Sequence, residues 1–407
     1  MLDKKNVLLK RRNFIVSIVG AGVTLTLGSR AMALASNNSS DAGTAANKDG
    51  GADLLGQSDR VGSLDEVVFG KPVVSLLDVN NLEPGKVHRL YFRGVETPSG
   101  QPWLVSVTVA KGARSGKRVT LVSGVHGDEM SSINTVQTIM NELNPAEMQG
   151  TVMAVFDVSR PAIEAMTRRW PNSGRGEDLI DINRLWPGDE NAASAPARHA
   201  WLLFNRLIRP NSDYVLDFHT GTTGIDVPAF HLAKMDVPEV REMAELFPVA
   251  QIFDNVGYPG LLSYALLEVG IPSFTPEVGN ARSLDRSKIS LFVEGTMNVL
   301  KLHGIIKGPI GRTSQNSGTF VGNSAFPVMA TSGGLVEHLV NLGDPVVSGQ
   351  KIAIKRNMFG EIVAEYTSPV NGEIGGLRSD ATSEPDNVLV FILFNETRPQ
   401  SRESYPE

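Results

Sequence analysis

One stretch, RVTLVSGVHGDEMSS from Arg118 to Ser132, constrains this chain more than any other. Val119 to Val122 are apolar or β-branched and predict a buried strand, which a Ser-Gly pair ends. His126 and Glu129 follow in a glycine-containing turn, before a predicted helix. Imidazole and carboxylate are both zinc ligands, at roughly 2.0 to 2.2 Å from the ion. A His and a Glu three residues apart at a strand end therefore predict part of a metal site.

The missing third ligand is predicted about ninety residues further on, in SDYVLDFHTGTTG. Tyr214 to Phe218 read as a strand that places His219 at its end. Asp217 lies two residues before His219 and therefore points to the same face, where its carboxylate could orient the imidazole or act close to the metal. Two His and one Glu leave a coordination position open, which is typical of catalytic zinc. An isolated HxxE would instead indicate an ordinary hydrogen-bonded histidine.

Two further motifs complete an ordered set. DINRLWPG runs from Asp181 to Gly188, and PSFTPEVG runs from Pro272 to Gly279. Together with GVHGDE and DFHT, they resemble in order and wording the succinylglutamate desuccinylase and aspartoacylase family, relatives of the zinc carboxypeptidases. The resemblance covers roughly residues 70 to 305. It implies a zinc-carboxypeptidase-like mixed sheet flanked by helices.

The same resemblance implies roles for individual residues. His126, Glu129 and His219 would hold one zinc ion per chain. Glu277 would be the catalytic carboxylate. An arginine shortly before the DxNR motif contacts the reacting carbonyl in this family. Arg168 fits that position best, and Arg169 and Arg175 compete with it.

Asn183 and Arg184 would bind a substrate carboxylate, as the family resemblance implies. The residue types support this role, because a guanidinium offers a fork of donors matched to a carboxylate and the Asn amide adds another donor. The alternative for an Asn-Arg pair is solvated surface, and for Glu277 it is a solvated loop carboxylate. The order of the motifs favours the functional interpretation.

The composition and the absence of certain motifs argue against several other kinds of function. The chain has no Cys, so thiolate zinc sites, Cys nucleophiles and disulfides are excluded, and any metal has to be held by His, Asp or Glu. A net charge of -6 gives no reason to expect nucleic acid. The sequence contains no G-x-S-x-G elbow, no P-loop and no strand-linked G-x-G-x-x-G. Serine hydrolase and nucleotide-binding functions are therefore disfavoured.

Residues 1–35 are predicted to be an export signal, with basic residues ahead of an apolar run from Phe14 to Leu27 and small-residue cleavage sites after it. The adjacent arginines in KRRNFI favour a twin-arginine signal. An ordinary secretory signal or an uncleaved anchor is the alternative, although the run is shorter than the roughly 20 residues that span a bilayer. The mature protein is thus expected in the periplasm or outside the cell. Residues 36–62 are polar and small and predict a disordered linker.

Two domains are predicted after the linker. In residues 63–308 strands alternate with helices, which favours an α/β domain with a largely parallel sheet covered on both faces. Glu277 is expected in a turn after the last strand. Residues 309–398 are expected to be all-β without helices, and they resemble the barrel-sandwich fold of biotinyl and lipoyl carriers. Their predicted hairpin tip, PVNG, has no lysine, so a structural module or a lid is expected instead of a carrier. Residues 399–407 are a tail.

The sequence therefore predicts a zinc-dependent amidohydrolase that cleaves an amide bond in a small carboxylate-bearing substrate, of the N-acyl amino acid deacylase type. A metallocarboxypeptidase or a peptidoglycan-peptide amidase would use the same residues, and so would an ester hydrolase. The alternative that is not an enzyme is a noncatalytic binding protein. The expected partner is a small carboxylate or a short peptide, with no nucleic acid and no stable membrane span once the signal is removed.

Overall fold

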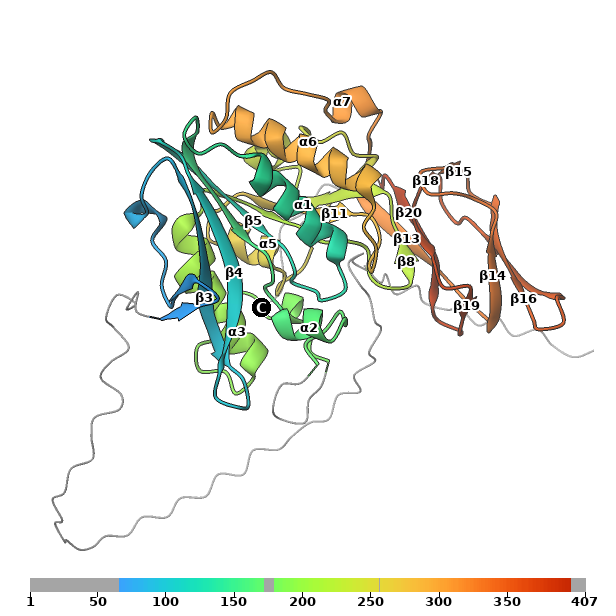
Figure 1. Cartoon of the computed structure of the whole chain (residues 1–407). Coiled ribbons are helices and arrows are strands. Elements are labelled where there is room, and N and C mark those ends of the chain that lie inside the picture. The colour runs from blue at the N-terminus through green and yellow to red at the C-terminus, as the bar shows by residue number, and fades with distance from the viewer. Residues whose placement is uncertain (1–65, 172–178, 256, 397–407) are drawn as a thin grey trace, which may run out of the picture.

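The computed structural model describes residues 66–171, 179–255 and 257–396 of the chain. The predicted export signal and linker, the C-terminal tail and Arg175 lie outside these described residues. Figure 1 shows two bodies, a larger one in which helices surround a sheet and a smaller one built from C-terminal strands. No described helix has both the length and the apolar character needed to cross a bilayer.

An 11-stranded sheet runs through the larger body in the order β1-β2-β3-β4-β6-β5-β7-β11-β9-β10-β12. The strands are β1 (Val67–Val68), β2 (Lys71–Val74), β3 (Lys86–Glu96), β4 (Pro102–Lys111), β5 (Arg114–Val122), β6 (Gln149–Val155), β7 (Tyr214–Asp217), β9 (Ala229–Ala233), β10 (Gln251–Asp254), β11 (Ser273–Val278) and β12 (Phe320–Gly322). The central neighbours β6, β5, β7 and β11 are parallel, whereas β3–β4, β4–β6 and β9–β11 are antiparallel. The sheet is therefore mixed, as the family resemblance implied, and less parallel than the alternation of elements suggested.

Helices cover both faces of this sheet, as predicted. Their bounds are α1 (Met130–Glu142), α2 (Arg160–Glu164), α3 (Ala195–Leu203), α4 (Pro238–Ala244), α5 (Leu262–Glu268) and α6 (Arg286–Leu302). Leu121 of β5 is buried in one apolar cluster with Ile139 of α1 and Phe292 of α6. The next residue, Val122, is buried on the other face in a cluster with Leu203 of α3. Successive strand residues point to opposite faces, so a strand covered on both sides needs a continuous apolar run.

The expected turn at Glu277 is wrong, because Glu277 lies inside β11. That strand is hydrogen-bonded to β7 on one side and to β9 on the other. Pro276 does not interrupt it, since its carbonyl accepts a hydrogen bond from the His219 N–H at 2.8 Å. The backbone pairing thus places Glu277 directly beside His219.

The smaller body consists of two packed sheets. One contains β13 (Ser324–Met329), β20 (Val388–Phe394), β18 (Gly372–Arg378) and β15 (Pro345–Val346), and the other contains β17 (Ile362–Thr367), β16 (Lys351–Arg356), β14 (Gly334–His338) and β19 (Thr382–Ser383). Ile352, Ile374 and Leu389 belong to the apolar core between them. The expectation of no helix in residues 309–398 is wrong by one turn, α7 (Ser314–Ser317), which lies against the larger body, where the Ser314 N–H donates to the Glu245 carbonyl. A capping box at its start and left-handed Gly318 at its end explain this turn.

One strand pairing joins the bodies. The short strand β8 (Ile225–Asp226), in the loop that follows His219, pairs with β18 of the smaller body. The chain also connects them directly, because β12, at the edge of the large sheet beside β10, is followed at once by β13 of the smaller body. The pairing of β8 with β18 therefore holds the smaller body close to the loop that carries a predicted metal ligand.

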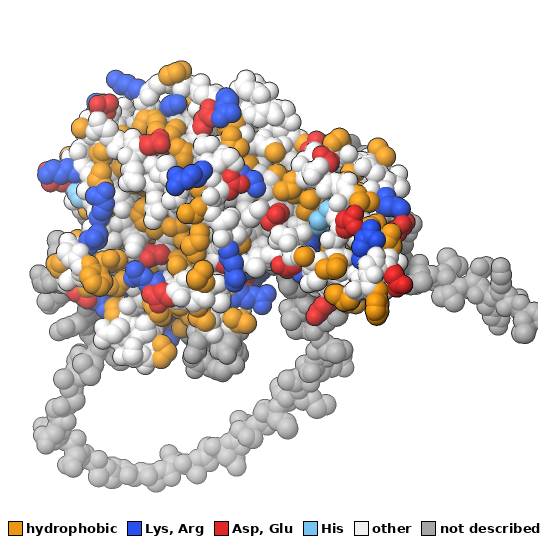
Figure 2. All heavy atoms as spheres, turned by 45° about the vertical axis from the view of Figure 1, so that its right-hand side comes forward, with side chains coloured by type: hydrophobic (Ala, Val, Ile, Leu, Met, Phe, Trp, Pro, Cys, Tyr) orange, Lys and Arg blue, Asp and Glu red, His pale blue; other side chains and the backbone are white. Residues whose placement is uncertain are grey.

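Figure 2 shows basic and acidic side chains interspersed on the face turned toward the viewer.

Candidate active site

The candidate site lies where three neighbouring parallel strands end. β5, β7 and β11 are adjacent in the sheet. His126 and Glu129 lie between β5 and α1, His219 follows β7, and Glu277 lies near the end of β11. Because the carboxyl ends of parallel strands meet at one edge, side chains far apart in the sequence converge there. The three predicted metal ligands do come together in the structure.

The three ligand side chains have the geometry of a single-ion site. The Nδ1 atoms of His126 and His219 are 3.1 Å apart. Glu129 Oε1 lies 2.8 Å from His126 Nδ1, and its Oε2 lies 3.0 Å from His219 Nδ1. All three residues are at most 1% exposed. Bonds of about 2.0 Å in a tetrahedral arrangement place neighbouring ligand atoms roughly 3.3 Å apart. The observed spacings therefore fit ligands that surround one ion.

Proton placement on the two rings supports a cation at this point. Each Nε2 faces a carboxylate: Asp181 Oδ1 is hydrogen-bonded to His126 at 3.0 Å, and Asp217 Oδ2 lies at ion-pair distance, 3.2 Å, from His219. A carboxylate beside Nε2 favours a proton on that nitrogen, which leaves a bare lone pair at Nδ1. Two such lone pairs and the Glu129 carboxylate then meet in a buried space, where they repel one another unless a cation lies between them. The donor set of two imidazoles and a carboxylate fits zinc.

The electrostatics of the cluster agree with that argument. Burial alone would raise the pKa of Glu129, but the imidazoles of His126 and His219 outweigh it and hold this pKa well below its usual value. Burial likewise opposes a charge on His219, yet the carboxylates of Asp217 and Glu129 raise its pKa well above the usual value. The negative potential that stabilises a protonated imidazole here would also stabilise a metal cation.

Arg168 is the predicted arginine that reaches the ligand cluster. Its Nη1 donates to Glu129 Oε1 at 2.6 Å, and its Nε lies 3.8 Å from Asp181 Oδ2. Burial lowers its pKa, but the surrounding carboxylates, Glu129 first, more than compensate and raise it. Its Nε and Nη2 have no hydrogen-bond partner among the described residues. Arg169 lines a neighbouring pocket, as Arg168 also does, but makes no contact with the three ligand side chains. Arg168 therefore keeps buried donors available close to the predicted metal.

Asn183 and Arg184 lie in a 3₁₀ turn, Ile182–Arg184, beside the ligands. The Asn183 side chain is buried, and its Oδ1 accepts a hydrogen bond from the backbone N–H of Leu262 at 3.1 Å. Its Nδ2 lies 3.4 Å from His219 Nε2. Arg184 points outward, with 29% of its side chain exposed and its guanidinium 4.8 Å from the centre of the Tyr258 ring. The pair thus extends from the buried ligands to a guanidinium that solvent can reach.

Glu277 is a buried carboxyl next to the ligand cluster. It is 2% exposed, and its Oε2 has no hydrogen-bond partner in the described part of the chain. Burial, reinforced by the charge of Glu129, raises its pKa well above the usual value, although His219 opposes the shift. A carboxyl with a raised pKa can both accept and return a proton near neutral pH, as general acid–base catalysis requires.

Sequence reasoning missed two residues of the site. Asp181 contacts His126, and its pKa is held below the usual value because His126, Arg168 and Arg184 outweigh its burial. Its place in the DINR motif, three residues before Arg184, could have indicated this role. Tyr258 faces Arg184 from the loop before α5, and no local pattern indicates it. The two segments meet because the Trp186 N–H donates to the Gly260 carbonyl at 3.1 Å.

Comparison with known proteins agrees with this geometry. Residues 115–303 match the family model of the succinylglutamate desuccinylase/aspartoacylase catalytic domain. The chain is 27% identical over 299 residues to the N-alpha-acetyl-L-2,4-diaminobutyric acid deacetylase of Halomonas elongata, covering 71% of this chain and 85% of that protein. It is 26% identical over 196 residues to the succinylglutamate desuccinylase of Pseudomonas paraeruginosa, covering 44% of this chain and 55% of that enzyme.

A solved structure shows the same fold. A succinylglutamate desuccinylase/aspartoacylase from Rhodobacter sphaeroides superimposes with a TM-score of 0.68 at 23% identity, over 79% of this chain and 98% of that one. The two proteins therefore share this fold over most of their length. Residues 115–303 thus match the catalytic domain of the succinylglutamate desuccinylase/aspartoacylase family, and the solved structure shows the same fold.

Proposed function

We propose that this protein is a zinc-dependent amidohydrolase that removes the acyl group from N-acyl amino acids. One observation carries the proposal: two imidazole Nδ1 atoms and a carboxylate converge within hydrogen-bond distance of one another in a buried position. Deacylases among the relatives support the amide as the bond that is cleaved. The three ligands leave room for substrate on the ion, which is typical of catalytic zinc.

The ligand set would hold the zinc through His126 Nδ1, His219 Nδ1 and Glu129. A zinc ion held there would act as a Lewis acid toward the scissile carbonyl and make water a nucleophile near neutral pH. Asp181 and Asp217 would keep the Nε2 protons in place, so that both Nδ1 lone pairs stay directed at the ion. The buried carboxylates thereby set the orientation of both rings.

The remaining residues would act on the substrate. Glu277 would take a proton from the attacking water and deliver it to the leaving nitrogen, because its raised pKa suits both steps. The unpartnered donors of Arg168 would stabilise the negative charge that develops on the carbonyl oxygen. Asn183 and Arg184 would hold the carboxylate of the amino acid, which fixes the distance between that carboxylate and the scissile bond.

A hydrolysis screen with the purified full-length chain tests the proposal. Its metal content is measured, and release of free amine is followed for N-acetyl and N-succinyl amino acids and for short peptides. The expected result is about one zinc per chain and hydrolysis of N-acyl amino acids, lost on chelation and restored by added zinc. A protein that holds zinc but cleaves no N-acyl amino acid would contradict the proposal. Release of C-terminal amino acids from peptides alone would identify a carboxypeptidase instead.

A further inference from the structure

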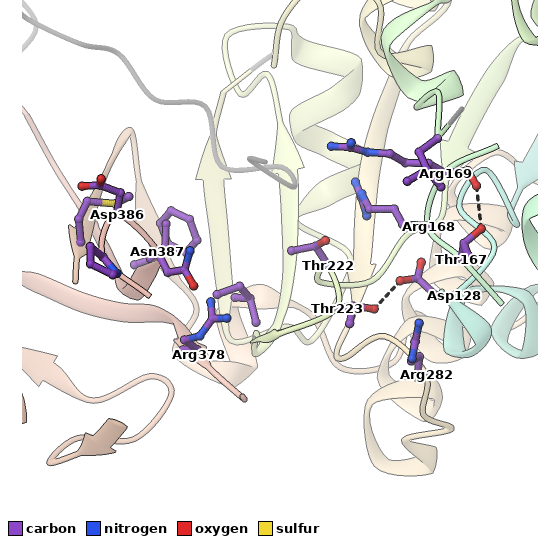
Figure 3. A pocket seen from close by; sticks show the side chains of 16 residues that line it. Asp128, Thr167, Arg168, Arg169, Thr222, Thr223, Arg282, Arg378, Asp386 and Asn387 are labelled. Atoms are coloured by element: carbon purple, nitrogen blue, oxygen red, sulfur yellow. Dashed lines mark hydrogen bonds between the residues drawn. The ribbon is translucent and has the colours of Figure 1, made fainter. Parts of the chain in front are cut away.

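The smaller body contacts two segments of the larger body that adjoin the candidate site. The first is the loop after His219, whose strand β8 pairs with β18 of the smaller body. The two bodies line a pocket of about 810 Å³ at this contact. Figure 3 shows Thr222 of this loop on one side of the pocket and Arg378 of β18 on the other. The smaller body therefore reaches the loop that carries a predicted metal ligand.

The second segment is the α5 entry segment, residues 258–262, which includes the start of α5. Leu393 of β20 is 4% exposed and lies in one apolar cluster with Leu261 of this segment. The Tyr258 ring packs against the same cluster. A Cβ on Gly322 of β12 would lie 2.5 Å from Leu393 Cγ, so a glycine there lets the large sheet approach this leucine closely. The smaller body is thus packed against the α5 entry segment.

The α5 entry segment also contacts the two residues proposed to bind the substrate carboxylate. The Leu262 backbone N–H donates to Asn183 Oδ1 at 3.1 Å. The Arg184 guanidinium lies 4.8 Å from the centre of the Tyr258 ring. A Cβ on Gly260 would lie 2.5 Å from the Arg184 carbonyl oxygen, so the two backbones approach each other closely. The segment therefore connects the smaller body to the carboxylate-binding pair.

The contacts between the two bodies disfavour a lid movement of the smaller body. Gln251 of β10 is buried, and its Nε2 donates to Glu373 Oε2 and to the Ile374 carbonyl of β18, both at 3.2 Å. Swinging the smaller body away would break these hydrogen bonds and the β8–β18 pairing, and it would expose the apolar cluster around Leu393 to water. Each of these changes costs free energy. The smaller body therefore serves as a fixed support for the α5 entry segment.

The α5 entry segment is the part of this cluster that can move most easily. Leu232 of β9 and Phe253 of β10 are the other buried members of the cluster, and they are paired with each other in the large sheet. Residues 258–261, in contrast, lie outside helices and strands. A shorter side chain at position 393 leaves a cavity, and the surroundings collapse into a cavity only as far as they are free to move. The α5 entry segment, rather than the sheet, is therefore expected to shift.

We propose that Leu393 is a positioning residue for the binding of the substrate carboxylate. Its packing holds the α5 entry segment, and that segment holds Asn183 and Arg184. A loosened contact at Leu393 therefore raises KM and leaves kcat little changed, because it weakens a binding interaction that substrate and transition state share. The role of Asn183 and Arg184 rests on the proposed function, whereas the coupling of Leu393 to the Leu262–Asn183 hydrogen bond does not.

The kinetic test compares Leu393→Ala with Leu389→Ala in the zinc-loaded full-length protein. Leu389 is a buried leucine of the same strand, but it lies in the core of the smaller body. With one N-acyl amino acid as substrate, Leu393→Ala should raise KM about threefold to tenfold with kcat little changed. Leu393→Met conserves the side-chain volume and should retain the wild-type KM. Leu389→Ala destabilises the protein but should also retain that KM.

Hydrogen exchange followed by mass spectrometry gives a readout that requires neither substrate nor turnover. The Leu262 amide is held by Asn183, so peptides that contain this amide should exchange faster in Leu393→Ala than in the wild type. The same peptides should exchange at the wild-type rate in Leu389→Ala. If Leu393→Ala does not fold, Leu393→Val leaves a smaller cavity at the same place and is measured against Leu389→Val.

Two results would overturn the inference. One is exchange of the Leu262 peptides that is unchanged in Leu393→Ala, or raised equally in both alanine variants. The other is a KM that Leu393→Ala leaves at the wild-type value while N-acyl amino acids are hydrolysed. Failure of the proposed function gives a different result, because the wild type would then hydrolyse no N-acyl amino acid, whereas the difference in exchange between the two alanine variants would remain.

Discussion

Replacing His231 by phenylalanine should make the folded protein less sensitive to acid. His231 lies in β9 and is 0% exposed. Its ring centre lies 4.6, 4.9 and 5.6 Å from the ring centres of Phe247, Phe274 and Phe292. Neither ring nitrogen has a hydrogen-bond partner in the described ranges. Burial in this aromatic cluster lowers the pKa of His231 to about 3.

The magnitude follows from linkage between protonation and folding. A histidine in an unfolded chain has a pKa of about 6.5, so below that pH the unfolded state binds a proton that folded His231 does not. The contribution of His231 is therefore fully present above pH 6.5 and is lost as the pH falls from about 6.5 toward about 3. The loss amounts to about 1.4 kcal/mol per pH unit, or about 2 kcal/mol between pH 7 and pH 5.

Urea unfolding of the wild type and of His231→Phe at pH 7 and pH 5 measures this effect. The variant should lose about 2 kcal/mol less of its free energy of unfolding over that interval. His199, whose burial lowers its pKa to about 4, has the same sign of effect and remains in both proteins. Phe292→Leu is the control, because it loosens the same cluster without removing a titrating group and should destabilise equally at both pH values. An acid sensitivity of His231→Phe equal to that of the wild type would refute the reasoning.

Three further variants test the site. Gly127→Ala would bring its Cβ to 2.0 Å from the carbonyl carbon of Ala162, so the turn that carries two ligands should shift and elemental analysis should find less than one zinc per chain; a full complement of zinc would contradict this. Glu277→Gln should retain zinc but lose about 10²- to 10⁴-fold in kcat, and an active variant would remove Glu277 from the proton-transfer role. Arg184→Lys should raise KM about tenfold with kcat little changed, since lysine lacks the bidentate fork; a fall in kcat alone would argue against carboxylate binding there.

The local sequence was sufficient to predict much of the candidate site and of the fold. The apolar run Val119–Val122 predicts β5, because a strand covered by helices on both faces cannot alternate polar and apolar residues. The same pattern followed by His126 and Glu129, and later by His219, predicted three side chains that the structure brings together. The carboxyl ends of neighbouring parallel strands meet at one edge of the sheet. Side chains predicted at such ends can therefore be inferred from the sequence to lie close together.

Tertiary structure decided the features that depend on contacts between distant segments. Glu277 lies within a strand because β9 and β7 pair with β11 on either side, and its own turn-like sequence does not encode those neighbours. Asp181 meets His126 across a separation of 55 residues, and Arg378 meets the loop after His219 across more than 150. Periodicity describes which face of an element is buried, but it carries no information about which other element covers that face. The sequence by itself therefore determined which three side chains are candidate metal ligands and the order of elements, whereas the packing of the two bodies decided the pocket between them and the environment of each charge.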